Sequence, residues 1–434
     1  MKYMPFTWLN TAGITSHHMN KYKFWSLKVA YSLLLLVVIV CSSMTNPPDA
    51  HLRRADKAYA NADFAEAAEY YQKVLEKDPK NIQALYRLGI SWLELRDPRK
   101  AKLCLQKVYE LDPRFGEKVI VNLAEALHQN YEFEEAKKYY QQEIYSTGRA
   151  DWNYVEVIRK RIDECNAGIA LLAQPSVAQV VNLGATVNSK DVEFVPVLTA
   201  NDTVLLFTSH QAPEGPEKIC ISRKKDNKWQ KSIEYLPADD KKLGHAIVTV
   251  SPNGALLYTY NAAVGLRSYD QTKGSWVNPK PMPIPLSQLA NETSVHITED
   301  GTFAFFSSDR PGGFGGLDLY VSQRFPDGTW SAAINLGASI NTAHDEDAAF
   351  VDSKTKTLYF SSRGHNTMGG FDIFKSVMKD GGFQPAQNVG YPINSPHDDL
   401  YFTLDCNRTS AFFSSDRPGG MGALDIYQIV LLEK

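Results

Sequence analysis

One sequence motif recurs at intervals near 50 residues in the second half of the chain, and it constrains the fold more than any other feature. The segment SSDRPGG (307–313) returns as SSRGH (361–365) and again as SSDRPGG (414–420). The tetrapeptides LDLY, FDIF and LDIY follow the three copies in turn. Four aromatic residues spaced 47, 54 and 53 positions apart keep the same period: Trp229, Trp276, Trp330 and Phe383. Short apolar runs between Gly, Pro, Asn and Asp predict strands and turns, and four short strands at this period are typical of a β-propeller blade.

The two ends of this repeat array predict how it closes. Residues 330–341 and 383–394 are expected to form outer strands that lead into the next blade, and residues 177–188 (VAQVVNLGATVN) match them. This matching segment precedes the first complete unit, whereas the last unit stops after its third strand near Val430. We therefore expect the N-terminal strand to complete the last blade, which gives five blades and removes an open sheet edge.

A second, shorter period occupies residues 48–172. Four positions recur 34 residues apart: Ala67, Tyr71, Val74 and Pro79 return as Ala101, Leu105, Val108 and Pro113. A third copy, shifted by one more residue, contains Phe133, Ala136 and Tyr140. A helix pair that cannot bury its apolar face alone stacks on its neighbours, so this pattern predicts a helical solenoid. A further helical segment, 154–172, is expected to cap it.

Residues 62–81 (ADFAEAAEYYQKVLEKDPKN) and 88–113 closely resemble tetratricopeptide repeats. The resemblance implies that the first helix of each repeat lines a concave groove, which commonly holds an extended segment or helix of a partner. Counting along the repeat places ten residues in this groove: Leu52, Asp56, Tyr59, Tyr86, Ile90, Leu93, Glu94, Val121, Glu125 and His128. The alternative is that the apolar members only pack against the neighbouring helix.

The second array resembles the WD-like repeats of the TolB-type propeller family over roughly residues 177–430. The motif fits well in the last three units and is degenerate in the first two, at 208–211 and 259–261. The expected fold is thus multidomain α plus β: residues 1–47 as an export segment, 48–174 as the tetratricopeptide solenoid and 175–434 as the all-β propeller.

The N-terminal segment carries the features of an export signal. An apolar run, 29–40, follows Lys21, Lys23 and Lys28 and precedes a polar stretch. The run is short for a membrane span, which needs roughly 20 residues. Cys41, at its end, resembles the acylated cysteine of bacterial lipoproteins, although Val40 stands where Gly, Ala or Ser is usual. We expect an exported protein of the periplasm or outer membrane, held either by a lipid on Cys41 or by an uncleaved anchor.

A recurring polar position begins each predicted innermost strand. Counting nine residues back from each turn gives Glu193, His245, Glu292, Asp347 and Asp399. Innermost strands line the channel of a propeller, so these residues predict a polar ring that could hold a cation or a basic ligand group. Alternatively, each pairs with Asp-Arg or serine groups of a neighbouring blade, for which Ser308, Arg310, Arg363, Ser415 and Arg417 are the candidates. The charged members of the blade motif are Asp309, Arg310, Arg363, Asp416 and Arg417. We favour this second interpretation, because contacts between blades repeat with the blades whereas a site need not. Asp318, Asp372 and Asp425 lie within a strand motif and are expected to be structural hydrogen-bonding groups.

Composition and motif searches exclude several functions. Lys and Arg number 46 against 49 Asp and Glu, a net charge of −3, so the chain lacks the basic excess of a nucleic-acid binder. Five cysteines without C-x-x-C spacing predict neither a metal cluster nor a disulfide scaffold, although a Cys220–Cys406 bridge stays open. No G-x-S-x-G, H-E-x-x-H or P-loop motif is present, and the glycine-rich segment 312–316 leads into a predicted strand rather than the helix that dinucleotide binding requires. We expect no cofactor and no bound metal.

The combined architecture resembles envelope proteins of gliding, type IX-secreting bacteria, in which tetratricopeptide repeats precede a TolB-type propeller. An OmpA-like, peptidoglycan-binding domain usually follows in that family; here Lys434 comes just after the final blade, so wall binding by that route is not expected. The sequence therefore predicts a non-enzymatic scaffold or adaptor that binds envelope proteins. This prediction of function rests on a resemblance of fold, which supports function only loosely. A glycan- or peptide-sensing propeller is the alternative, and a hydrolase or lyase using the carboxylates and His245 is a third hypothesis.

Overall fold

The computed structural model describes most of the chain after residue 49. The described residues are 50–116, 118–147, 152–176, 178–199, 202–211, 215–235, 246–251, 255–261, 265–272, 275–282 and 294–431. The predicted export segment with Cys41, and also His245 and Glu292, lie outside them. The chain divides into two compact units, one ending at Arg87 and one beginning at Leu88. This division falls inside a helix of the repeat array, whereas the repeat pattern places the domain boundary near residue 174.

The first unit contains helices α2 (Ala50–Ala60) and α3 (Phe64–Lys77) and the start of α4 (Ile82–Glu94). Helix α3 begins where the Asp63 side chain accepts a hydrogen bond from the Glu66 N–H, which satisfies one of the free amides of its first turn. The repeat positions Ala67, Tyr71 and Val74 are buried on α3. The Tyr71 hydroxyl donates to Asp56 of α2 at 2.7 Å, so a polar contact fixes how the two helices pack.

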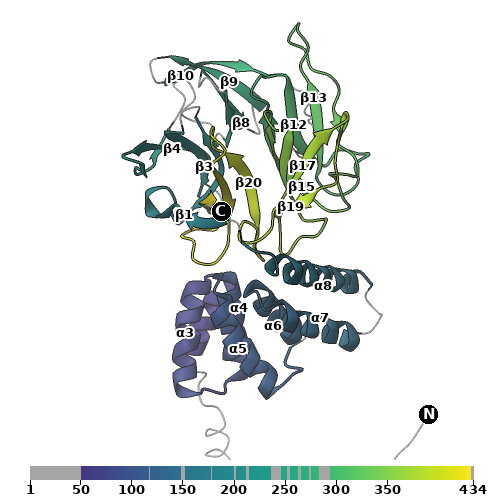
Figure 1. The fold of residues 1–434 in the computed structure, drawn as a ribbon. Helices are drawn as coiled ribbons and strands as arrows, with labels where there is room; N and C mark the ends of the chain where they lie inside the picture. Colours follow the sequence, from purple (N-terminus) through teal and green to yellow (C-terminus); the bar gives the residue numbers. More distant parts are fainter. Residues whose placement is uncertain are drawn as a thin grey trace, which may run out of the picture. The chain divides into compact units, whose positions relative to one another are not determined.

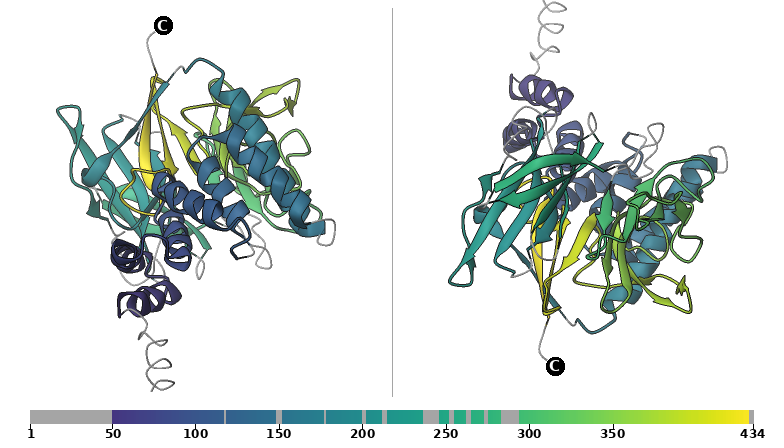
Figure 2. Two further views of the ribbon diagram at one scale, coloured as in Figure 1. Left: turned by 90° about the horizontal axis from the view of Figure 1, so that it is seen from below. Right: turned by 90° about the horizontal axis from the view of Figure 1, so that it is seen from above.

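The second unit holds the remaining helices, α5 (Pro98–Leu111), α6 (Val119–Gln129), α7 (Phe133–Thr147) and α8 (Trp152–Leu172). Consecutive members pack against one another, and the repeat positions Ala101 and Ala136 are fully buried. Gly168 is required where α8 crosses α7, because a Cβ there would lie 2.5 Å from the ring of Phe133. The predicted helical repeats and their capping helix are therefore present. Helix α8 lies alongside blades coloured green to yellow in both views of Figure 2.

The strands form five antiparallel sheets of four or five strands each, which are the five predicted blades (Figure 1). Blade 1 contains β2 (Val192–Leu198), β3 (Val204–His210), β4 (Glu217–Lys225), β5 (Lys228–Trp229) and β6 (Ile233–Glu234). Blade 2 contains β7 (Ala246–Val250), β8 (Leu256–Asn261), β9 (Gly265–Thr272) and β10 (Ser275–Pro281). Blade 3 contains β11 (Val295–Ile297), β12 (Phe303–Ser308), β13 (Asp318–Gln323) and β14 (Ile334–Asn335). Blade 4 contains β15 (Glu346–Asp352), β16 (Thr357–Ser362), β17 (Asp372–Lys379), β18 (Gly382–Phe383) and β19 (Gln387–Asn388).

Blade 5 joins the two ends of the propeller sequence. Its strands are β20 (Asp399–Leu404), β21 (Ser410–Ser415), β22 (Asp425–Leu431) and the N-terminal strand β1 (Ala178–Asn182). Strand β1 pairs antiparallel with β22, from Ala178 opposite Leu431 to Asn182 opposite Tyr427. The prediction that the N-terminal strand closes the last blade is confirmed. The innermost strands β2, β7, β11, β15 and β20 contact one another in a closed ring.

A buried network of one aspartate and two asparagines fixes the outer edge of this closing blade. Asn182 donates to Asp425 at 2.8 Å, and Asn188 donates to the Asn182 side-chain oxygen at 2.9 Å. The Asn188 amide also pairs with both backbone groups of Ile426, accepting at 2.9 Å and donating at 3.0 Å. The same arrangement recurs in blade 3 with Asp318, Asn335 and Asn341, and in blade 4 with Asp372, Asn388 and Asn394. The repeated N-x-G-x-x-x-N segment thus specifies how each of these three blades ends.

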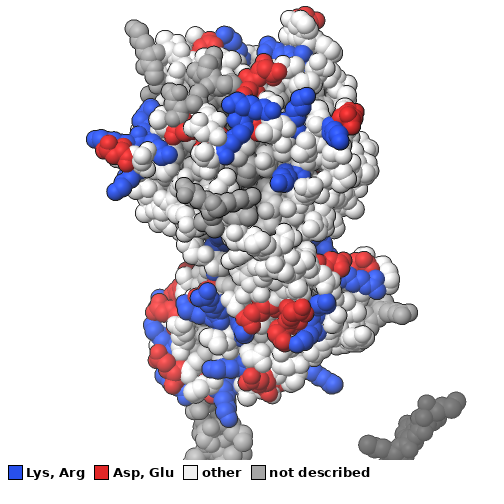
Figure 3. Space-filling view, in the orientation of Figure 1, with Lys and Arg blue, Asp and Glu red and all other residues white. Residues whose placement is uncertain are grey.

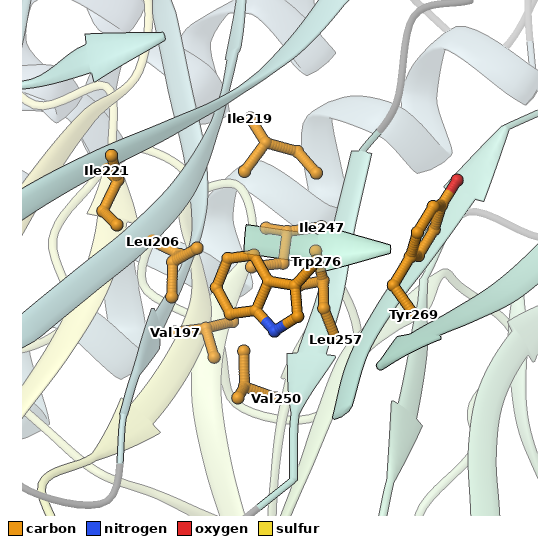
Figure 4. Packing of buried hydrophobic residues seen from close by; sticks show 9 residues of the cluster. All are labelled: Val197, Leu206, Ile219, Ile221, Ile247, Val250, Leu257, Tyr269 and Trp276. Atoms are coloured by element: carbon orange, nitrogen blue, oxygen red, sulfur yellow. The ribbon is translucent and has the colours of Figure 1, made fainter. Parts of the chain in front are cut away.

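Apolar side chains fill the space between neighbouring blades. Figure 4 shows the nine-residue cluster shared by blades 1 and 2, in which Trp276 packs among side chains from β2, β3, β4 and β7. Trp276 is 4% exposed, and Tyr269 and Leu206 are fully buried. The position of Trp276 in this core explains why an aromatic residue recurs near the same point of each repeat.

We predict that Asn188→Ala destabilises the closed propeller. The substitution leaves the N–H of Ile426 without a partner, whereas the Ile426 carbonyl keeps its hydrogen bond from the Leu183 N–H. One buried backbone group left unpaired costs about 1–3 kcal/mol, so the free energy of unfolding should fall by about that amount, measured by denaturant unfolding followed by tryptophan fluorescence. Gln179→Ala, at an exposed position of β1, is the control and should change it by no more than about 0.5 kcal/mol. Equal effects of the two substitutions would contradict the role given to Asn188.

Candidate functional site

The carboxylates at the start of the innermost strands are engaged in local hydrogen bonds. Glu193 accepts from the backbone and the hydroxyl of Ser189 and from Ser209. Asp399 accepts from the backbone and hydroxyl of Ser395 and pairs with Arg417 at 2.5 Å. Both are at most 1% exposed. Each carboxylate therefore stabilises, through hydrogen bonds, the loop that leads into its own blade.

In blade 4 the equivalent residue is Glu346, one position before the predicted Asp347. Glu346 lies opposite Ser362 just as Glu193 lies opposite Ser209, and it accepts from Thr342 four residues earlier. Because side chains alternate between sheet faces, Asp347 points to the other face. There it accepts from Ser307 at 2.6 Å and from Ser294, which ties blade 4 to blade 3. The described members of the predicted ring are thus at most 5% exposed, and other residues line the axis.

The charged residues of the blade motif have different surroundings. Arg417 lies between Asp399 and the rings of Phe413 and Tyr427, with its guanidinium 5.0 and 5.2 Å from their centroids. Arg310 makes the equivalent contacts in blade 3, 4.9 Å from the rings of Phe306 and Tyr320. The three remaining charged residues of the motif differ from one another. Arg363 pairs with Asp398 at 3.4 Å, Asp416 pairs with Arg96, and Asp309 is exposed after β12.

Four predicted groove residues belong to the unit that ends at Arg87. Asp56 is the acceptor for Tyr71 and forms an ion pair with Arg87 at 2.6 Å. Tyr59 packs edge-on against the rings of Phe64 and Tyr71. Leu52, on α2, and Tyr86, on α4, are half-buried. Asp56 and Tyr59 thus contribute to helix packing.

Four of the six groove residues in the second unit line one hollow. Ile90, Leu93 and Glu94 come from α4 and Glu125 from α6. We call this space of about 330 Å³ the repeat hollow; its other lining residues are Arg96, Asn122, Gln129, His397 and Asp416. Val121 is half-buried on α6 outside it, and His128 is 1% exposed. The His128 Nε2–H donates to the Met368 carbonyl of the propeller at 2.8 Å, so this predicted groove residue binds a loop of its own chain.

The repeat hollow holds more negative than positive groups. The nearby charges of Arg161 and His128 outweigh burial and lower the pKa of Glu125 to about 2, so its carboxylate is ionised. Burial raises the pKa of Asp416 to about 6, an effect that Arg96 opposes from 3.0 Å. Glu94 is exposed at the edge. Three carboxylates and one arginine thus line the hollow, and Arg161 pairs with Glu125 at 3.7 Å. On the face drawn in Figure 3 charges of both signs are interspersed over the repeat helices.

Two buried acceptor atoms in the repeat hollow have no partner among the described residues. They are His397 Nε2 and Gln129 Oε1. Burial, reinforced by Arg417 and Arg96, lowers the pKa of His397 to about 4, so the imidazole is neutral near pH 7. A hydrogen bond to the backbone of Gln129 uses its one N–H, which leaves Nε2 with a free lone pair. The wall of the hollow thus contains two unpartnered acceptor atoms beside its carboxylates.

A second space lies on the propeller axis. This axial cavity of about 380 Å³ is lined by residues of all five innermost strands or the residues next to them, together with Glu217 and Tyr260. Its walls are mainly apolar and aromatic, including Phe194, Phe350 and Phe402. Concave sites of this size and composition are typical of small-molecule binding.

The geometry defines the class of the protein as a tetratricopeptide-type helical array joined to a closed five-bladed propeller. A sequence model of the family described as "Tetratricopeptide repeat" matches residues 58–114. Among solved structures, the chain is similar to a gluconolactonase from Xanthomonas campestris, with 13% identity, 61% of this chain and 92% of that chain covered, and a TM-score of 0.36. It is also similar to a thermostable family-43 glycoside hydrolase, with 14% identity, 57% and 92% coverage and a TM-score of 0.39.

The helices resemble the first tetratricopeptide domain of Spaghetti bound to an HSP90 peptide, with 19% identity, 25% of this chain and 90% of that chain covered, and a TM-score of 0.23. At these TM-scores no site residue is transferred from any of the three structures. Among the described residues, no helix is both long enough and apolar enough to cross a membrane.

The described cysteines are unpaired. Cys104, Cys165, Cys220 and Cys406 are all free thiols. Burial raises the pKa of Cys220 to about 12 and that of Cys406 to about 11, so neither is a reactive thiolate near pH 7. The Cys220–Cys406 bridge that the sequence left open is absent from the structure.

Sequence reasoning missed Glu346, His397 and the lining of the axial cavity, whereas it gave four of the nine residues that line the repeat hollow. The first could have been found, because a serine or threonine precedes each loop carboxylate by four residues: Ser189 before Glu193, Thr342 before Glu346 and Ser395 before Asp399. His397 carries no such signal, since its role depends on a helix far away in the sequence.

We predict that Glu346 makes propeller stability fall as pH rises toward neutrality. Burial raises the pKa of Glu346 to about 7, against about 4.3 for an unfolded glutamate. The folded chain then holds a proton that the unfolded chain releases between these values, so this group's contribution to stability is lost across that window. Glu346→Gln should flatten the fall between about pH 4.3 and pH 7, measured as the unfolding midpoint at each pH. Asp416 titrates in the same range, so the quantity to compare is the difference between wild type and variant; identical pH slopes would contradict the prediction.

Proposed function

We propose that this protein is a non-enzymatic scaffold of the cell envelope that binds protein partners through its repeat helices and its propeller. A tetratricopeptide array and a closed propeller are both preformed binding surfaces, and the family match covers the repeats. The loop carboxylates, which offered the clearest candidates for acid–base chemistry, are committed to serine, threonine and arginine partners. We place the chain in a type IX secretion machine or a related envelope assembly, a proposal that rests on the domain order alone.

The repeat hollow is the observation that carries the partner-binding proposal. Its unpartnered acceptors, His397 Nε2 and Gln129 Oε1, lie among three carboxylates and one arginine. A group that both donates hydrogen bonds and carries positive charge complements the unpartnered acceptors and the carboxylates at once. The guanidinium of arginine is such a group, with five N–H donors. The partner segment that fits this hollow is therefore basic.

A second function, ligand binding by the propeller, is favoured by the axial cavity. The sequence places such a role on a ring of carboxylates, whereas the observed cavity is lined mainly by apolar and aromatic side chains. The two functions use different parts of the chain and are compatible with each other.

We predict that Glu94→Lys weakens binding of a basic peptide. The test titrates the full chain with two octapeptides, one alternating Arg and Gly and the other alternating Glu and Gly. The Arg peptide should bind more tightly, and its affinity should fall roughly three- to tenfold in the variant and also with added salt. Glu110→Lys on α5, outside the hollow, makes the same charge change and is the matched control.

The same variants connect the peptide assay to cellular partners. Proteins captured by cross-linking in intact envelopes should be shared by wild type and Glu110→Lys and depleted in Glu94→Lys. Equal binding of the two peptides, or equal loss in both variants, would overturn the assignment of the hollow as the partner site.

We also propose that the chain is exported and anchored by a lipid on Cys41. The support is the sequence pattern of the apolar run and the cysteine that follows it. Cys41→Ala should abolish incorporation of an alkyne-labelled fatty acid during expression in a bacterium that matures lipoproteins, and Ser42→Ala should leave it intact. If wild type takes up no label and still sediments with membranes, the uncleaved anchor is the correct alternative.

A further inference from the structure

The innermost strands are interrupted at the same level as they pass the axial cavity. The regular pairing with the next strand breaks between Phe194 and Val197, Ile247 and Thr249, Asp347 and Phe350, and Leu400 and Thr403. Extra residues at such bulges bend a strand and re-aim its side chains, and bulges are enriched next to binding and active sites. Residues of all four interruptions line the axial cavity.

Three of the bulges contain a residue in a costly backbone conformation. Val195, Ala348 and Tyr401 have φ values of +52°, +55° and +59°. This left-handed region is unfavourable for residues with a Cβ, most of all for β-branched valine. All three residues line the axial cavity. Strain repeated at one level of three blades is a feature that a packed core alone does not require.

One polar group at the cavity lacks a partner. His296, on β11, is 9% exposed, and its Nε2 has no hydrogen-bond partner among the described residues. Burial lowers the pKa of His296 to about 4, and a hydrogen bond to the backbone of Val351 accounts for its single N–H. At neutral pH this lining residue therefore carries an acceptor lone pair that has no partner among the described residues.

The aromatic side chains around His296 indicate the shape of a ligand that would fit beside it. Phe350 meets His296 edge-on with centroids 5.1 Å apart, and Phe350 and Phe402 lie 6.3 Å apart. Phe194 and Tyr401 form a second pair at 5.6 Å. Aromatic side chains in such arrangements favour another flat ring, through edge-to-face or offset contacts.

We propose that the axial cavity binds a small aromatic molecule whose ring N–H or O–H donates to His296 Nε2. The space of about 380 Å³ exceeds the roughly 150 Å³ of an engineered apolar cavity that accepts benzene. The proposal is independent of the repeat hollow, which shares no lining residue with the axial cavity.

The test compares two probes of nearly the same shape, indole and benzothiophene, of which only indole carries an N–H donor. Binding to the full chain is measured by calorimetry at pH 7. Wild type should bind indole more tightly, roughly three- to tenfold, as one neutral hydrogen bond provides. His296→Phe keeps an aromatic ring without the acceptor and should bind the two probes equally. His344→Phe, at an exposed position outside the cavity, should retain the preference.

A measurement on wild type covers the case in which His296→Phe does not fold. The ¹⁵N resonance of His296 Nε2 should shift when indole is added and stay in place when benzothiophene is added. The proposal is overturned if neither probe binds wild type, if His296→Phe keeps the preference for indole, or if the Nε2 resonance does not respond to indole. Failure of the basic-peptide assay leaves these outcomes unaffected, so the two proposals are judged separately.

Discussion

Hydrogen bonds from Asn182 and Asn188 to the last blade hold the ring of strands closed. In blades 3 and 4 the same aspartate–asparagine network joins residues about 20 positions apart, whereas in blade 5 it joins residues about 240 apart. Asn188 is 3% exposed, so water offers its partners little compensation if it is lost. This contact, together with the pairing of β1 with β22, therefore stabilises the closed ring of innermost strands that surrounds the axial cavity.

The helices of the second unit meet the propeller through a few polar contacts. Arg96 pairs with Asp416 and donates to the Ala423 carbonyl, and His128 donates to the Met368 carbonyl. These contacts occupy part of the concave face that a tetratricopeptide array ordinarily leaves open. What remains open is the repeat hollow, which therefore combines groove residues such as Leu93 with propeller residues such as His397.

Periodicity predicted the number of blades and the strand that closes them, because both follow from the spacing of strands along the chain. It placed the blade-4 carboxylate at Asp347 instead of Glu346, since the count from the turn is one residue out in this blade and a shift of one residue reverses the face. The axial cavity could not be predicted, because it depends on bulges, and the strands around Phe194 and Phe350 read as regular in the sequence. The repeat pattern gave the helix side of the hollow, including Leu93 and Glu125, but not its propeller side, since Gln129 and His397 meet only after the helices pack on the propeller.

The closing strand β1 is also the strand that follows α8 along the chain. Tension that passes along the chain from the helices therefore reaches the propeller at the seam between β1 and β22, where the first and last strands of the propeller pair. The propeller is thus loaded at its point of closure, and the five residue pairs from Ala178 to Asn182, with the asparagine network, resist opening of the ring there. A scaffold built in this way couples mechanical load on one domain to the integrity of the other.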